Sequence, residues 1–211
     1  CDIVRDTVAK NEHHTESNVR IVYSGGISSD GVSPEGNGIL MVMVTPRHVL
    51  PESWYSEGAK IITVDMERYM PLAKSTNYLS AVYALEMAKK EDAIESIYVD
   101  RHQRVLEGTT SSIFFVKRST LVTPDDGILP GVTRSVVLDL AKEGFDIELR
   151  NVQFSELSAM DEVFITASNK EVVPIVRISD LVIGNGQPGP HTRTIMARFK
   201  DYTEAYGRGE H

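Results

Sequence analysis

The stretch PLAKSTNYL (71–79) runs directly into SAVYALEMAKK (80–90), and this junction decides how the rest of the chain is interpreted. The second stretch has apolar residues at the spacing of an amphipathic helix. Lys74 is therefore expected at the end of an extended segment, just before a helix, where its ammonium group is held in place and not simply solvated. Most lysines are exposed, but a desolvated lysine loses its proton readily and can attack carbonyl carbon.

Strands and helices alternate irregularly on both sides of this junction. The patterns predict strands at residues 19–23, 38–44, 60–65, 95–100, 112–117, 120–124, 145–152, 161–167 and 172–178. They predict helices at residues 78–90, 135–143 and 191–206. Because several strands are joined as hairpins, the fold class is predicted to be mixed α/β (α+β) and not a regular βαβ winding.

Composition limits the size of the fold and its partners. The 211 residues are 41% hydrophobic and 25% charged, which suits one large domain or two small ones with a buried core. The formal net charge is -8 and no block of Lys and Arg is present, so a nucleic-acid partner is not expected. The most apolar run, GILMVMV (38–44), is too short to span a bilayer and is predicted to be a buried strand.

The amino-terminal sequence and the cysteine content indicate a compartment. The first residues carry early charges and lack the long apolar core of a signal peptide. Cys1 is the single cysteine, so a disulfide framework within the chain is excluded. A cytoplasmic protein without a membrane partner is therefore expected.

A carboxylate stands at the start of a run of small residues in VLEGTTSSIFFV (105–116). Taken alone, Glu107 would be interpreted as a turn carboxylate that faces water. The alternative is a carboxylate held at a strand end, where it would pair with a protonated ring nitrogen. The five small residues that follow, 108–112, would leave space for a flat ligand.

Two further segments have the composition of anion sites. In LPGVTR (129–134), a glycine, a valine and a threonine begin a helix, which leaves backbone N–H groups and a hydroxyl suited to phosphate. Many helices begin with such residues simply as caps. In ITASNKEVVP (165–174), Ser168 and Asn169 follow a buried strand, where they would either complete a phosphate site or form an ordinary turn.

One ligand with an aldehyde, a ring nitrogen and a phosphate would account for all these segments, and pyridoxal 5'-phosphate has all three groups. The sequence also resembles the class IV aminotransferases of fold type IV, which include branched-chain and D-amino-acid aminotransferases and aminodeoxychorismate lyases. The resemblance covers nearly the whole chain and rests on KSTNYL, the EG pair ahead of SSIFFVK, LVTP, GILPGVTR, MDEVFIT, VVPIV and IGNGQPGPHT, in this order.

The resemblance implies a role for individual residues of these motifs. Lys74 would be the catalytic residue and the Schiff-base attachment point of the cofactor, and Glu107 would hold the ring nitrogen. The other expected cofactor-binding residues are Tyr78 near the phenolic oxygen, Leu129 on the ring face, and Gly131, Val132, Thr133 and Ser168 around the phosphate. The expected substrate-binding residues are Thr110, Ser111 and Asn169.

The resemblance also implies a domain organisation. Residues 1–44 would be the remnant of a small amino-terminal α/β domain, because the family usually has a longer one that supplies a phosphate-contacting arginine. Residues 45–56 would be an interdomain linker, and residues 57–211 a larger pseudo-barrel domain that binds the cofactor. Members of this family are expected to form homodimers or higher homo-oligomers.

The implied reaction is a ping-pong transfer of an amino group from an amino acid to 2-oxoglutarate. KSTNYL is similar to the branched-chain enzymes, whereas Ser111 and Ser112 stand where those enzymes commonly carry an acidic residue and Asn. D-amino acid aminotransferase and aminodeoxychorismate lyase activities therefore stay open as alternatives, although VYSGGISSDG (22–31) lacks an arginine that several D-specific enzymes have. A non-catalytic binding fragment is the alternative from another class.

Two other features are assigned no role in this chemistry. His13 and His14 are adjacent and would point apart on a helix, so a solvated turn is favoured over a metal site, and no metal is expected. Trp54 and Tyr55, in the expected linker, are interpreted as packing or interface residues.

Overall fold

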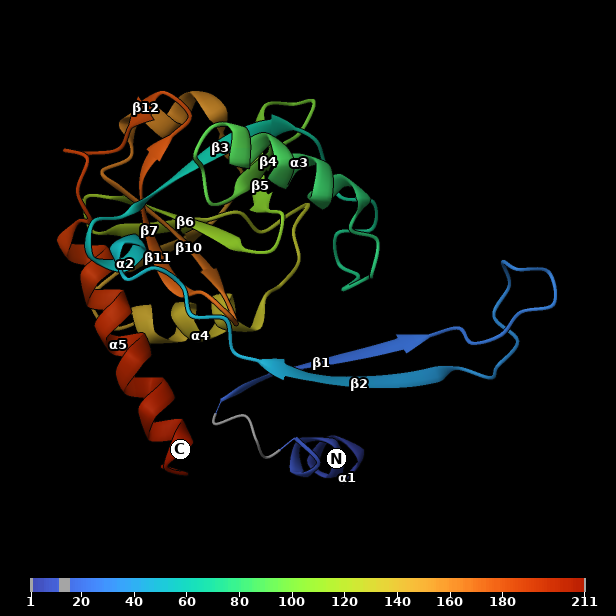
Figure 1. The fold of residues 1–211 in the computed structure, drawn as a ribbon. Coiled ribbons are helices and arrows are strands. Elements are labelled where there is room, and N and C mark those ends of the chain that lie inside the picture. Colours follow the sequence, from blue (N-terminus) through green and yellow to red (C-terminus); the bar gives the residue numbers. More distant parts are fainter. Residues whose placement is uncertain (1, 12–15, 211) are drawn as a thin grey trace. The chain divides into compact units, whose positions relative to one another are not determined.

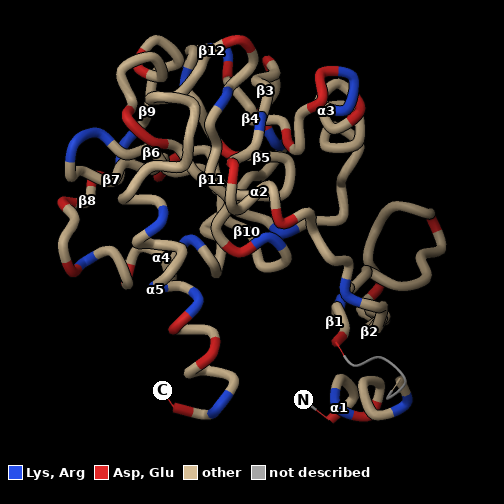
Figure 2. Tube along the Cα trace, turned by 60° about the vertical axis from the view of Figure 1, so that its left-hand side comes forward, with Lys and Arg blue, Asp and Glu red and all other residues tan. Residues whose placement is uncertain are grey.

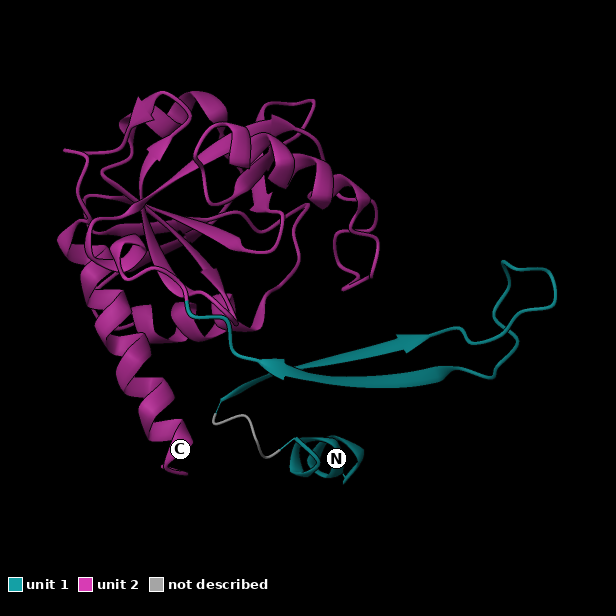
Figure 3. Ribbon diagram, in the orientation of Figure 1, with its two compact units in different colours: residues 1–49 teal, residues 50–211 magenta. Residues whose placement is uncertain are grey.

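A computed structural model describes residues 2–11 and 16–210. Cys1, His13 and His14 lie outside these described residues. The chain divides into two compact units, residues 1–49 and residues 50–211 (Figure 3). The boundary falls inside the segment 45–56, and each unit is described by itself.

Unit 1 is a helix followed by a β-hairpin. Helix α1 spans Asp2–Ala9, and strands β1 (Ser17–Ser24) and β2 (Ile39–Pro46) pair antiparallel over their full lengths. The strands predicted here are present, but the expected burial of the second is wrong, because every residue of β2 is exposed or half-buried. Within this unit the only helix among the described residues is two turns long, which is too short to cover both faces of a two-stranded sheet.

Unit 2 is built on one mixed sheet of ten strands among its described residues. They are β3 (Ala59–Asp65), β4 (Ser96–Val99), β5 (Arg104–Gly108), β6 (Ser112–Lys117), β7 (Thr120–Thr123), β8 (Asp146–Leu149), β9 (Val152–Gln153), β10 (Glu162–Ala167), β11 (Glu171–Ile178) and β12 (Leu181–Val182). The order is β8-β7-β6-β10-β11-β3-β4-β5-β9, with β12 also on β11. Parallel and antiparallel pairs both occur, which confirms the predicted mixed class.

The connections require this sheet to curl. β5 and β6 lie far apart in the strand order, yet only residues 109–111 join them. The edge strands β8 and β9 are likewise separated only by residues 150–151. The single strand predicted at 145–152 is therefore wrong: the chain leaves one edge of the sheet and joins the other. Arg150 holds this crossing by donating to Glu148 at 3.0 Å and to Glu156 at 2.9 Å.

Helices cover the sheet on different sides (Figure 1). They are α2 (Ser53–Ser56), α3 (Leu79–Lys90), α4 (Val132–Ala141), the 3-10 helix η1 (Phe154–Ala159) and α5 (Pro190–Gly207). α4 and α5 pack against β10, where Phe114 of β6 stacks on Phe164 with ring centroids 4.9 Å apart. α3 packs on β3 and β4 through its buried alanines. α4 begins three residues before the predicted start, and Gly144, shortly after its end, has a positive φ of 97°, which favours glycine where a helix stops.

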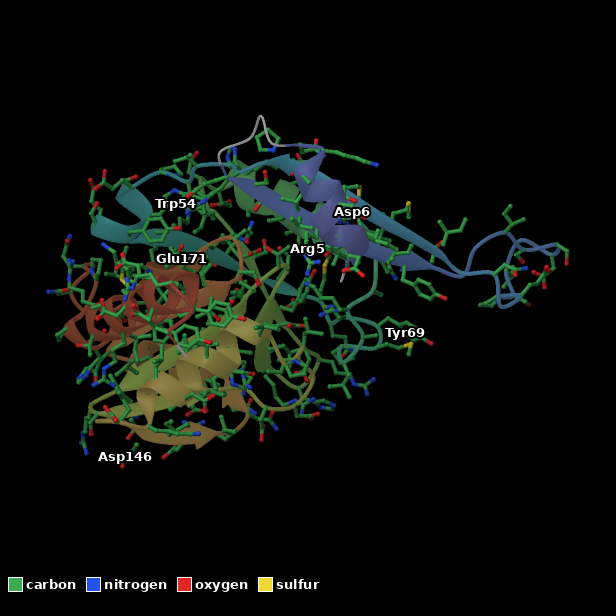
Figure 4. All side chains as sticks on the ribbon, turned by 90° about the horizontal axis from the view of Figure 1, so that it is seen from below. Arg5, Asp6, Trp54, Tyr69, Asp146 and Glu171 are labelled. Carbon is green, nitrogen blue, oxygen red and sulfur yellow. The ribbon has the colours of Figure 1, made fainter. Side chains whose placement is uncertain are left out.

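Trp54 and Tyr55 of α2 pack against the core of unit 2, which confirms their interpretation as packing residues (Figure 4 labels Trp54). The Tyr55 hydroxyl also donates a hydrogen bond to the carbonyl of Lys170 at 3.0 Å. Along α5 the basic residues Arg193, Arg198 and Lys200 come first, and the acidic residues Asp201 and Glu204 follow toward its C-terminal end (Figure 2). In the part of the chain that the structure describes, we find no helix with the length and apolar character needed to cross a membrane.

Asp100 stabilises the turn between β4 and β5 through hydrogen bonds, and its loss is expected to destabilise unit 2. Its buried carboxylate accepts hydrogen bonds from the N–H groups of His102 and Arg104, both at 2.9 Å, and from the Arg104 guanidinium at 2.7 Å. Burial acts to raise the pKa of Asp100, but these donors outweigh it and lower the pKa below the ordinary value. We expect Asp100→Asn to reduce the free energy of unfolding at pH 7 by about 1–3 kcal/mol, measured by urea denaturation.

The difference in the free energy of unfolding between the wild type and Asp100→Asn should depend on pH. The folded protein binds the Asp100 proton more weakly than the unfolded chain does, so the contribution of Asp100 is present at neutral pH and is lost as pH falls through the lowered pKa. Asp126→Asn is the control, because Asp126 also pairs with Arg104, at 3.1 Å, but is exposed. An equal effect of both substitutions, or a difference that does not shrink in acid, would contradict the role of Asp100.

Candidate active site

A pocket of about 320 Å³ opens on unit 2 where the β5–β6 turn, the β3–α3 loop, the start of α4 and the end of β10 meet. Its volume lies within the range of small-molecule sites, roughly 300–1,000 Å³. The predicted site residues that line it are Lys74, Glu107, Thr110, Ser111, Leu129, Gly131, Val132, Thr133 and Ser168. Tyr78 lines a smaller adjoining pocket, which shares Arg68, Lys74 and Thr109 with the first. Asn169 follows Ser168 in the β10–β11 turn but lines neither pocket.

Glu107 lies near the end of β5, and its side chain is only 5% exposed. One carboxylate oxygen accepts a hydrogen bond from Arg68 Nη1 at 3.0 Å, and the other accepts from the N–H of Leu129 at 3.0 Å. The interpretation of Glu107 as a turn carboxylate that faces water is therefore wrong. Burial raises the pKa of Glu107, while the Leu129 N–H, Arg68 and Lys74 act in the opposite direction.

Arg68 is the site residue that sequence reasoning missed. Besides its ion pair with Glu107, its Nη2 donates to the carbonyl of Ala73 at 2.7 Å, so it joins the acidic group to the loop that carries Lys74. The available signal was an arginine shortly after a buried strand, six residues before the candidate lysine. That signal is weak, because arginines at strand ends are usually solvated.

Lys74 lies in the loop between β3 and α3, where its side chain lines both pockets. The expected extended segment is wrong, because residues 69–73 form turns and bends. The expected desolvation is also wrong: Lys74 is exposed, as is Tyr69 in the same loop (Figure 4). The loop belongs to no strand of the sheet, and within unit 2 its lysine lines the pocket wall while staying exposed.

The start of α4 forms a further part of the pocket wall. Gly131 is the N-cap, its backbone is extended, and no side chain caps the helix. The first intrahelical bond runs from the N–H of Ser135 to the Gly131 carbonyl at 3.0 Å, so the N–H groups of Val132 and Thr133 are left for an outside acceptor. A Cβ at Gly131 would lie 3.0 Å from the Ser112 hydroxyl oxygen, which favours glycine here. The start of α4 can therefore bind an anion.

These groups match the chemistry of pyridoxal phosphate. The pocket is lined by a carboxylate that can hold a protonated ring nitrogen, by an uncapped helix start and by a primary amine. The Thr166 hydroxyl, which also lines the pocket, is buried and makes no hydrogen bond to any described residue. The residues present therefore fit this cofactor.

Comparison with known proteins supports this chemistry. The family model described as amino-transferase class IV matches residues 2–178. A putative branched-chain-amino-acid aminotransferase of Methanocaldococcus jannaschii is 33% identical over 98% of this chain and 74% of its own length. A D-alanine aminotransferase of Bacillus licheniformis is 36% identical over 72% of this chain and 54% of its own length.

The solved structures agree with the fold. The branched-chain amino acid aminotransferase of Thermobaculum terrenum, crystallised in its pyridoxal phosphate form, superposes with a TM-score of 0.83 at 26% identity. The match covers 96% of this chain and 68% of that one. The expected fold type IV architecture is confirmed, and the chain belongs to the class IV aminotransferase family.

Proposed function

We propose that this protein is a pyridoxal-phosphate-dependent aminotransferase that takes the amino group of branched-chain L-amino acids and passes it to 2-oxoglutarate. The observation that carries the proposal is that one pocket is lined by both the Glu107–Arg68 ion pair and the uncapped start of α4. Lys74 lines the same pocket.

Each residue has a separate task in this proposal. Pyridoxal phosphate, when bound, supplies a carbonyl carbon for attachment and a ring that accepts electrons from the substrate α-carbon. Lys74 would provide the attaching amine and, once displaced by the substrate, would remove the proton from that α-carbon. Arg68 favours the ionised form of Glu107, which would then keep the ring nitrogen protonated. The N–H groups of Val132 and Thr133 would hold the phosphate.

The ring face and the substrate side are proposed from the same pocket. Leu129 would pack on the ring, and Tyr78, from the adjoining pocket, would lie near the phenolic oxygen. Ser168 would complete the phosphate site, and the backbone of Asn169 would lie near the substrate carboxylate. Because the cofactor would keep the amino group after the first keto acid leaves and before the second one binds, the kinetics should be ping-pong.

The choice of branched-chain L-amino acids rests on the KSTNYL motif and on the names of the similar proteins. The alternative, a D-amino acid substrate, is favoured by the serines at 111 and 112 and by the similarity to a D-alanine aminotransferase. A lyase that releases pyruvate from aminodeoxychorismate would use the same lysine.

Single-turnover half-reactions separate these possibilities. The pyridoxal-phosphate-loaded protein is mixed with L-leucine, L-valine, D-alanine, D-glutamate or aminodeoxychorismate, and the cofactor absorbance is followed as the amino form accumulates. We expect L-leucine and L-valine to react fastest. Rapid reaction of D-alanine with L-leucine inert would replace the substrate assignment, and pyruvate release without transamination would indicate the lyase.

A further inference from the structure

A second buried acidic residue is hydrogen-bonded to side chains that line the pocket, and the proposed reaction does not use it. Glu95 immediately precedes β4 and has no exposed surface. One of its carboxylate oxygens lies 3.0 Å from Nζ of Lys170, whose residue is 8% exposed. The two residues are far apart in sequence, and their ion pair crosses the interior of unit 2.

Three consecutive hydroxyls of the β5–β6 turn point at this carboxylate. Thr109 makes a short hydrogen bond to one Glu95 oxygen, and Thr110 and Ser111 bond to the other at 3.0 and 3.2 Å. An ionised carboxylate can only accept, so each hydroxyl must donate its hydrogen to Glu95. These hydroxyls therefore have no hydrogen left to donate to a ligand, and toward the pocket Thr110 and Ser111 can offer only lone pairs and backbone groups.

Lys170 carries the same network into the second turn that borders the pocket. It stands in the β10–β11 turn, two residues after Ser168, and its Nζ also donates to the Thr110 hydroxyl at 2.8 Å. The carbonyl of Lys170 is held from the other side by the Tyr55 hydroxyl. The backbone N–H groups of Ser168 and Asn169, in contrast, donate to no other residue that the structure describes.

A buried ion pair of this kind is not explained by stability alone. Removing two charges from water costs free energy that their attraction often only offsets, and an apolar pair of similar size can be equally stable. The ion pair does fix local geometry. The Glu95 carboxylate determines where three hydroxyl hydrogens point. The Lys170 ammonium, bonded to that carboxylate, determines the distance between the two turns.

We propose that Glu95 and Lys170 are a positioning pair that joins the 109–111 turn to the 167–170 turn and sets the shape of the substrate side of the pocket. The substrate side of the pocket is defined by the proposed function, so the proposal rests on that function. The coupling of the two turns, however, can be measured without cofactor. Glu95 and Lys170 would act through the residues that they hold and would not contact the reacting atoms.

The first test measures hydrogen exchange of the ligand-free protein by mass spectrometry. Lys170→Met keeps the length of the side chain and leaves Glu95 buried without its cation. We expect exchange to become at least about tenfold faster at the hydrogen-bonded amides of both turns, those of residues 108 and 109 and of residue 170. The matched control is Lys142→Met. It removes an ion pair between Lys142 Nζ and Asp139 Oδ1, 2.6 Å apart, in which both side chains are exposed. Faster exchange in one turn only, or in neither, would overturn the proposal.

The second test uses the double variant Glu95→Gln/Lys170→Met, which removes both charges and so should recover much of the thermal stability lost in the single variant. The probes are pyridoxal phosphate and, for the loaded protein, 4-methylvalerate, which has the branched chain and carboxylate of leucine without the amine. We expect pyridoxal phosphate affinity within about twofold of wild type and 4-methylvalerate affinity about tenfold weaker, because only the substrate side loses its fixed geometry.

Wild-type affinity for 4-methylvalerate in the double variant would overturn the positioning role, because stability alone would then account for the ion pair. If Lys170→Met fails to fold, the exchange measurement is made on the double variant with the same expectation. A wild-type protein that binds no pyridoxal phosphate would refute the proposed function instead, while the exchange rates would still test the coupling of the two turns.

Discussion

Lys74→Ala is expected to lower the rate of transamination by at least about 10²–10⁴-fold, the usual contribution of a positioned proton-transfer group. Among the described residues that line the two pockets, Lys74 is the only lysine, so no other amine there can attach the cofactor or move the α-proton. Since Lys74 is exposed, its removal should leave the midpoint of thermal unfolding unchanged within error. Initial rates with L-leucine and 2-oxoglutarate, together with a melting curve, check both expectations.

Lys89→Ala is the matched control, because Lys89 is an exposed lysine on α3 whose partner is the nearby Glu86. Its rate should equal that of the wild type. A Lys74→Ala protein that keeps more than about a tenth of the wild-type rate would show that another group performs the proton transfer.

Glu107→Gln is expected to lower turnover by about ten- to a hundredfold, because a charge-assisted hydrogen bond to the ring nitrogen is worth roughly 1.5–3 kcal/mol. Glutamine has the same shape but no charge, so it would not keep that nitrogen protonated. Affinity for pyridoxal phosphate should change much less, since the start of α4, where we propose that the phosphate binds, is intact. Steady-state rates and an absorbance titration measure the two effects, and an unchanged rate would exclude the proposed role of Glu107.

The same substitution has an expected effect on stability, which separates its catalytic effect from damage to the fold. Burial raises the pKa of Glu107, so the folded protein binds this proton more tightly than the unfolded chain does. The contribution of Glu107 to the free energy of unfolding therefore falls as pH rises from the ordinary glutamate pKa toward the raised one. Relative to wild type, the ligand-free Glu107→Gln protein should become more stable over that interval in urea denaturation.

Much of the site could be predicted because its residues stand at the ends of strongly patterned elements. Ser168 follows the apolar run of β10, whose length marks a strand, and the small residues after Glu107 stand directly before the apolar run of β6. Only two apolar residues precede Glu107, so β5 itself was not predicted. The glycine and threonine at the start of α4 are local signals as well. Such signals depend on neighbours in the chain, so they can be found without knowing the fold.

The features that sequence reasoning missed depend on contacts between distant segments. Arg68 gains its role only when the sheet brings Glu107 beside it, 39 positions along the chain. The break between β8 and β9 follows from the curl of the sheet, and nothing in the alternation of 145–152 marks it. The exposure of β2 and of Lys74 was also missed. The type of a residue, whether apolar or reactive, does not show whether the rest of the chain covers it.

The central claim is that pyridoxal phosphate is held covalently by Lys74, and borohydride reduction tests it most directly. The protein is loaded with pyridoxal phosphate, reduced with sodium borohydride, digested, and mapped by mass spectrometry. The account predicts a yellow protein before reduction and one phosphopyridoxyl group afterwards, on the peptide that contains Lys74. A colourless protein, or a label on another lysine such as Lys170, would contradict it.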